Sequence, residues 1–179
     1  MPVDRRCGRR HALKNVVTLA ACASMLASCA NASYQTAAMQ ASEGGDRKAA
    51  ISLAKKEVAR FSRPDECSRT TSLNCGTLAL AYGTLAGYQI VDGDSTAGEG
   101  SFSSAKGALG LTDPGIRSSA TAMVYRDVSE AFWKVGDRTR AAVVFNEGRA
   151  AGADKRLFMS SSAGAADRQP TDQQSTDPP

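Results

Sequence analysis

The chain has 179 residues, with 22 Lys and Arg against 18 Asp and Glu, a formal net charge of +4. Five of the basic residues and one acid precede Cys29, so the part from this cysteine onward carries 17 of each sign. That balance excludes nucleic-acid binding driven by net charge. The single histidine, His11, also precedes Cys29, so the remainder lacks the residue for a Ser-His-Asp triad or histidine metal ligation.

Residues 1–28 have the order of a secretory signal, because a basic segment precedes the apolar run "VVTLAACASML" at 16–26. This run is well short of the roughly 20 residues that a membrane-spanning helix needs. It ends at Leu26-Ala27-Ser28-Cys29, which resembles the lipobox of bacterial lipoproteins. The resemblance implies a diacylglycerol on the Cys29 sulfur, cleavage before Cys29, and a fatty acid such as palmitate on the new amino terminus.

The residue after Cys29 bears on localisation. In Gram-negative lipoproteins an Asp there favours retention in the inner membrane, and this chain has Ala30. The resemblance therefore implies a lipid-anchored protein of the cell envelope, at the outer membrane and facing the periplasm. The alternative is cleavage by the general signal peptidase at Ala30-Asn31-Ala32, which would release a chain that begins at Ser33.

Two further cysteines, Cys67 and Cys75, remain in the mature part, eight positions apart. In an oxidising compartment this spacing predicts one local disulfide. The alternative, a redox or metal-binding pair, is disfavoured because the spacing is not C-x-x-C.

A pattern built on Gly-Asp recurs at 45–46, 93–94 and 136–137. Eleven residues before each glycine stands a tyrosine, five residues after it a small residue, and nine residues after it Ala or Phe. The tyrosines are Tyr34, Tyr82 and Tyr125; the small residues are Ala50, Gly98 and Ala141; the later positions are Ala54, Phe102 and Phe145.

Each copy predicts two antiparallel helices. Glycine ends the first helix in a left-handed conformation, and the aspartate caps the second by accepting a hydrogen bond from a free amide. The tyrosine points inward, the small residue lies where the helices touch, and the later aromatic packs on the next pair. Apolar residues at three- and four-residue steps on both sides of 136–137 support helices there.

The third copy resembles a tetratricopeptide repeat. The matching positions are Tyr125, Val128, Ser129, Phe132, Gly136-Asp137, Ala141, Phe145 and Gly148. Ala153 replaces the family's closing proline, Gln89 replaces the second aromatic in copy two, and alanines replace the aromatics in copy one. The resemblance covers 33–154 and implies an all-α fold of three antiparallel helix hairpins stacked as a short array. The alternative is an unrelated irregular helical bundle.

Copies lie 48 and 43 residues apart, against 34 in the family. We expect the extra length in loops at 62–77 and 107–115. The apolar stretch 77–91 predicts a buried central helix, in which Gly83 and Gly87 admit a close neighbour, and the alternative is a contact with the membrane.

The predicted organisation has four parts. They are a lipoprotein signal peptide at 1–28, a lipid-anchored linker at 29–32, a helical repeat domain at 33–159 and a disordered tail at 160–179. The tail is rich in Ser, Gln, Asp and Pro and cannot bury enough apolar surface to fold.

In the repeat family, ligands lie along a concave face lined by the first helices. The positions implied here are Gln35, Met39, Ile90, Arg126, Glu130, Trp133 and Lys134. The last four combine Trp and Arg with a carboxylate and an ammonium, and we predict that they bind a partner. The alternative is a solvated helix face with i,i+4 ion pairs and Trp133 in the core.

These features together predict a non-enzymatic adaptor in an envelope assembly or export system. It would bind the membrane through its lipid and an envelope protein through its repeats, with no cofactor or metal and with self-association possible. One alternative is a stand-alone surface lipoprotein. Another is an envelope enzyme with a carboxylate pair such as Asp127 and Glu130, against which stands the lack of hydrolase, metalloprotease and phosphate-loop motifs.

Overall fold

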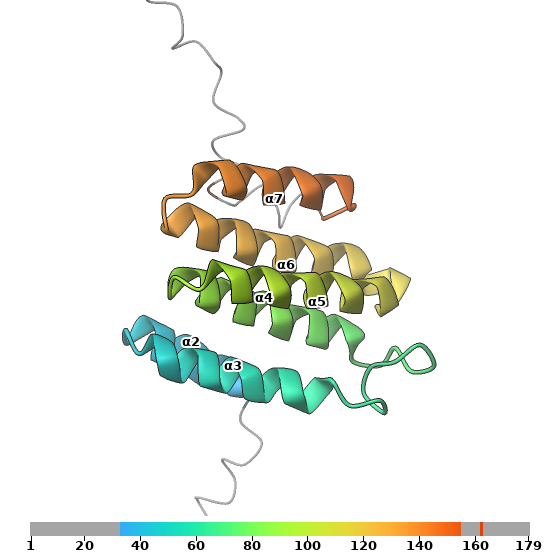
Figure 1. Ribbon diagram of the computed structural model, residues 1–179. Coiled ribbons are helices and arrows are strands. Elements are labelled where there is room, and N and C mark those ends of the chain that lie inside the picture. The colour runs from blue at the N-terminus through green and yellow to red at the C-terminus, as the bar shows by residue number, and fades with distance from the viewer. Residues whose placement is uncertain (1–32, 155–161, 163–179) are drawn as a thin grey trace, which may run out of the picture. The chain divides into compact units, whose positions relative to one another are not determined.

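The computed structural model describes residues 33–154 and Ser162, and within them the chain is all-helical (Figure 1). The helices are α2 (Tyr34–Glu43), α3 (Arg47–Phe61), α4 (Cys75–Val91), α5 (Ser95–Leu111), α6 (Pro114–Lys134) and α7 (Arg138–Ala150). The predicted signal peptide and linker, and the predicted tail apart from Ser162, lie outside the described residues.

The same turn joins α2 to α3, α4 to α5, and α6 to α7. Its glycines, Gly45, Gly93 and Gly136, have φ values of 84°, 96° and 86°. Each glycine N–H donates to the carbonyl three residues back, and the next N–H donates to the carbonyl five residues back. These bonds satisfy the last carbonyls of the first helix. The predicted left-handed glycine is confirmed in all three copies.

The aspartate of each turn caps the helix that follows. Its carboxylate accepts a hydrogen bond from the backbone N–H three residues on, at 2.9, 3.0 and 2.9 Å for Asp46, Asp94 and Asp137. Such a cap contributes about 0.5–2 kcal/mol to helix stability. The predicted capping role is confirmed.

The small residue five positions after each glycine lies at a helix contact, as predicted. Ala50 and Ala141 are fully buried. Gly98 has still less room, because a Cβ there would lie 2.5 Å from Ile90 Cγ1 and 3.1 Å from the Ala86 carbonyl oxygen. Helices α4 and α5 therefore come so close at Gly98 that the space holds a hydrogen atom but no side chain.

Aromatic packing links neighbouring helix pairs. The rings of Phe102 in α5 and Tyr125 in α6 meet edge to face, with centroids 5.0 Å apart. Phe145 is buried and Tyr82 packs half-buried against the core. Tyr34 departs from the predicted inward position and is 39% exposed, because no described helix covers the outer side of α2.

Helix α4 is the centre of the described fold. It packs against α3, α5 and α6, and ten of its residues are buried. A Cβ at Gly83 would lie 3.3 Å from the Cα of Val124, so α4 and α6 run close together. The predicted buried central helix is confirmed. In 33–154 no helix combines the length and apolar character needed to cross a bilayer.

The loop between α3 and α4 is held at its end. Cys67 and Cys75 form a disulfide, and Cys75 is the first residue of α4 and fully buried. The Asn74 side-chain amide donates to the Glu66 carboxylate at 2.5 Å. The loop therefore spans 62–74, and the last residues of the predicted range 62–77 belong to the helix.

The predicted loop at 107–115 is wrong. Helix α5 continues to Leu111 and α6 begins at Pro114. Asp113 caps α6 by accepting from the Gly115 N–H at 2.7 Å, and proline is favoured at the first helical position. The extra residues of this copy therefore lengthen the two helices instead of enlarging the connection.

The contact at Gly98 can be tested against another glycine of the same helix. We expect Gly98→Ala to lower the free energy of unfolding by about 1–3 kcal/mol, because the new methyl meets Ile90. Gly100 has no atom within 4 Å of its missing Cβ, so Gly100→Ala should raise stability by about 0.5–1 kcal/mol. Denaturant unfolding of both variants measures this, and equal stability would contradict the close contact.

Candidate functional site

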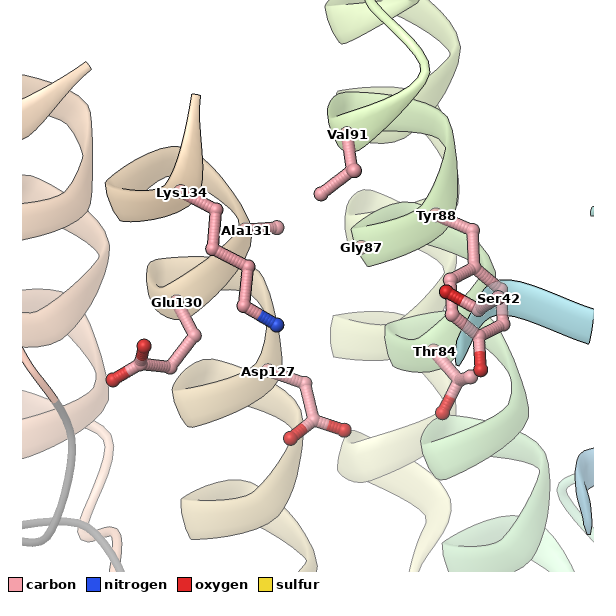
Figure 2. A pocket seen from close by; sticks show the side chains of 9 residues that line it. All are labelled: Ser42, Thr84, Gly87, Tyr88, Val91, Asp127, Glu130, Ala131 and Lys134. Carbon is pink, nitrogen blue, oxygen red and sulfur yellow. The ribbon is translucent and has the colours of Figure 1, made fainter. Parts of the chain in front are cut away.

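A pocket of about 270 Å³ lies between α2, α4 and α6 (Figure 2). Each of these three helices ends at one of the Gly-Asp turns. The lining residues are Ser42 from α2; Thr84, Gly87, Tyr88 and Val91 from α4; and Asp127, Glu130, Ala131 and Lys134 from α6.

The pocket exists because two small residues face each other. A Cβ at Gly87 would lie 3.8 Å from the Cβ of Ala131 and 3.6 Å from the Asp127 carbonyl oxygen. Longer side chains at either position would fill the space between α4 and α6. The α2 wall is the least anchored, because Ala38 is the one buried residue of that helix.

The α4 and α6 residues occupy equivalent places in copies two and three. Counted back from Gly93 and from Gly136, both sets stand nine, six, five and two residues before the glycine. This is the i, i+3, i+4, i+7 spacing of one helix face. Equivalent faces of two helices therefore form opposite walls of the pocket.

The polar groups of the pocket have different directions. Figure 2 shows the Lys134 ammonium and the Asp127 carboxylate pointing into the space between α4 and α6. The Glu130 carboxylate points away from Asp127. It accepts hydrogen bonds from the backbone N–H of Ser162 and, at 3.0 Å, from the Ser162 hydroxyl. Glu130 therefore contacts Ser162, which follows α7 in the chain.

Burial against the pocket walls raises the pKa of the Asp127 carboxyl above its usual range. The ion pair with Arg126, at 3.4 Å, opposes this rise in pKa, as does Lys134, while Glu130 adds to it. The Asp127 side chain keeps 37% of its surface exposed, so solvent moderates these effects. Burial also raises the pKa of the Tyr88 phenol, with a contribution from Asp127.

The four predicted partner-binding residues do not form one surface. Glu130 and Lys134 line the pocket. Arg126 pairs with its neighbour Asp127 instead of forming the i,i+4 pair with Glu130. Trp133 is half-buried under Arg138 of α7, whose guanidinium carbon lies 3.7 Å from the centroid of the ring. Trp133 therefore belongs to the α6–α7 contact.

The predicted position of Ile90 on the concave face is wrong. Ile90 is buried in the core, where it meets Gly98, and it is the equivalent of Trp133 in copy two. Gln35 and Met39 are exposed on α2. The positions implied by the repeat family were therefore wrong for Ile90 and Trp133. Both side chains contact the helix that follows their own and do not line an open face.

Sequence reasoning missed Ser42, Thr84 and Tyr88 as lining residues and considered Asp127 only as a catalytic carboxylate. A signal was present for α4, because Thr84, Gly87, Tyr88 and Val91 have helical spacing. Thr84, Gly87 and Val91 also repeat the positions of the charged residues Asp127, Glu130 and Lys134 in copy three. This pattern was overlooked because residues 77–91 are apolar almost throughout and were interpreted as a buried helix.

Among residues 33–154 and Ser162, no group of three or more His, Cys, Asp or Glu side chains is arranged to hold a metal ion. No protein-family model, curated protein or solved structure matches the chain.

The electrostatics of the pocket can be tested on Asp127 by NMR titration of its carboxyl carbon. We expect Lys134→Ala to raise the Asp127 pKa further and Glu130→Gln to lower it, because both side chains act on this carboxyl. Lys106→Ala is the control, since Lys106 pairs with Glu147. An Asp127 pKa that responds to neither pocket variant would contradict the described arrangement.

The same carboxyl makes stability depend on pH. Because folding raises its pKa, the native state binds this proton more tightly than the unfolded state does. Its contribution to stability is present at pH values below the unfolded pKa and is lost as pH rises through the native pKa. We therefore expect Asp127→Asn to reduce the loss of stability between acidic and neutral pH, as measured by denaturant unfolding.

Proposed function

We propose that this chain is a lipid-anchored envelope lipoprotein that binds a segment of a partner protein through stacked, tetratricopeptide-like helix hairpins. The observation that carries the proposal is the pocket to which α2, α4 and α6, one helix from each pair, contribute side chains. Helices far apart in sequence thus share one surface, as expected of a repeat array that presents a common binding face.

The recurring turn supports the repeat arrangement. In all three Gly-Asp turns the glycine ends one helix and the aspartate caps the next. The pocket residues of α4 and α6 stand at equivalent positions before the turns that follow these helices. Contacts of α3 with α4, α4 with α6, and α5 with α6 join successive pairs. An irregular bundle gives no reason for this coincidence of turn and lining positions.

The chemistry of the lining suits an extended peptide. Lys134 is a donor, Asp127 is an acceptor, and the hydroxyls of Ser42, Thr84 and Tyr88 can act as either. A peptide backbone has both kinds of group, and Val91 and Ala131 offer apolar contact to its side chains. Small polar clusters on an apolar floor are typical of binding sites.

Binding is favoured over carboxylate catalysis by the directions of the two acids. A mechanism that uses a carboxylate pair needs both carboxyl groups to reach one substrate bond. Here Asp127 pairs with Arg126 while Glu130 turns toward Ser162. We therefore propose an adaptor without enzymatic activity, whose partner belongs to an envelope assembly such as a pilus, secretion or polymer-export system.

Partner binding can be tested by site-specific photocrosslinking in intact cells. A photoreactive residue at Thr84, in the pocket, should give one dominant protein adduct. A photoreactive residue at Val143, on α7 and 60% exposed, should not give that adduct. Asp127→Ala with Lys134→Ala should reduce the adduct by about tenfold or more, as loss of central interface residues does. The same adduct from both positions would contradict the pocket as the binding site.

The anchor can be tested on Cys29. We expect Cys29→Ala to abolish fatty-acid labelling and to move the protein from the membrane fraction to the soluble fraction. If the general signal peptidase acts instead, the purified protein will begin at Ser33 and Cys29→Ala will change neither readout.

A further inference from the structure

Helix α3 carries an unbalanced positive charge on its exposed side. Its five basic residues, Arg47, Lys48, Lys55, Lys56 and Arg60, are all exposed. Its one acid, Glu57, is buried. Since the part of the chain from Cys29 onward is neutral overall, this face is a local concentration of charge and not a reflection of composition.

The basic residues share one side of the helix. At 3.6 residues per turn, Lys48, Lys55, Lys56 and Arg60 fall within about 140° of the helix circumference. The acids that follow α3 in the chain are engaged elsewhere, because Asp65 and Glu66 both pair with Arg63. The basic α3 face, defined by these four residues, therefore keeps its charge toward solvent.

This face lies beside the start of the described domain. The Lys56 ammonium is 5.9 Å from the centroid of the Tyr34 ring, at the first residue of α2. Four residues separate Tyr34 from Cys29, and five extended steps span at most about 18 Å. A lipid on Cys29 would hold Tyr34 within that reach of the bilayer surface, and Lys56 of α3 lies next to Tyr34.

We propose that the basic α3 face lies on the anionic phospholipid headgroups of the bilayer that holds the Cys29 lipid. The inference rests on the anchor in the proposed function. One lipid-anchored point leaves a domain free to rotate, whereas a second, electrostatic contact fixes which side faces the membrane. Each basic residue near an anionic surface strengthens the attraction about fivefold.

Such an orientation gives the pocket a defined position. Helices α2, α4 and α6 line the pocket, while α3 belongs to the second members of the helix pairs. Contact through α3 leaves the pocket lining free for a partner. The interaction would weaken with salt, because exposed charges are screened over a Debye length of about 8 Å at physiological ionic strength.

The test uses the lipidated protein purified from membranes and reconstituted into vesicles. Two compositions are compared, phosphatidylcholine alone and phosphatidylcholine with phosphatidylglycerol. Flotation reports the anchor, and labelling with a membrane-impermeant amine reagent, read by mass spectrometry, reports the exposure of each lysine. Lys106, on α5 and paired with Glu147, is the internal control.

We expect the protein to float with both vesicles. Lys55 and Lys56 should be labelled about fivefold or more slowly with phosphatidylglycerol, and high salt should remove this protection. Lys106 should be labelled equally throughout. Lys55→Gln with Lys56→Gln should also remove the protection of Lys48, whereas Lys106→Gln should leave it unchanged.

Other outcomes separate the two proposals. Failure to float with phosphatidylcholine would overturn the anchor and, with it, this inference. Flotation with equal labelling of Lys55 and Lys56 in both vesicles would overturn the α3 contact alone. Protection by inorganic phosphate in phosphatidylcholine vesicles would likewise overturn it, because the face would then be a general anion site.

Discussion

The close approach of α4 to its neighbours is the constraint on which the rest of the described structure depends. On one side Gly98 of α5 leaves room for Ile90, and on the other Gly83 lets α4 meet the backbone at Val124. Protein interiors are packed densely enough that one added methyl group at such a point is felt. The pocket between α4 and α6 has its width because these contacts set the separation of the two helices.

The pocket and the core use the same helices for opposite purposes. On α6, Val128 and Phe132 face the interior, while Asp127 and Ala131, one position earlier in each case, line the pocket. A helix rotation of about 100° per residue produces this change. Core packing therefore fixes the directions of the pocket side chains, and a partner would meet groups that are already oriented.

Features of the fold that depend on neighbouring residues in the chain could be predicted from the sequence, whereas features that depend on contacts between helices could not. The Gly-Asp turns were predictable because glycine conformation and aspartate capping involve only neighbouring residues. The connection at Thr112 and Asp113 was not, because repeat spacing does not say whether extra residues extend helices or loops. Gln89, at an expected aromatic position, is buried and accepts a hydrogen bond from Ser101 in α5 at 2.6 Å. That tertiary contact left no periodic signal.

The lining of the pocket was only partly predictable for the same reason. The repeat register implied Glu130, Trp133 and Lys134 alike, but only Glu130 and Lys134 line the pocket. The position of Trp133 relative to α7 depends on the stacking with Arg138, a contact between two helices. Residue chemistry alone does not distinguish a binding tryptophan from one that joins helices.

The weak burial of α2 has a consequence for how a ligand reaches the pocket. Helix α2 contributes Ser42 to the lining but has a single buried residue, Ala38, whereas α4 has ten. Local opening of a folded protein begins where little apolar surface is buried. Amide hydrogens of α2 should therefore exchange with solvent before those of α4 and α6. If the pocket binds a partner as proposed, α2 is therefore the wall that would open first.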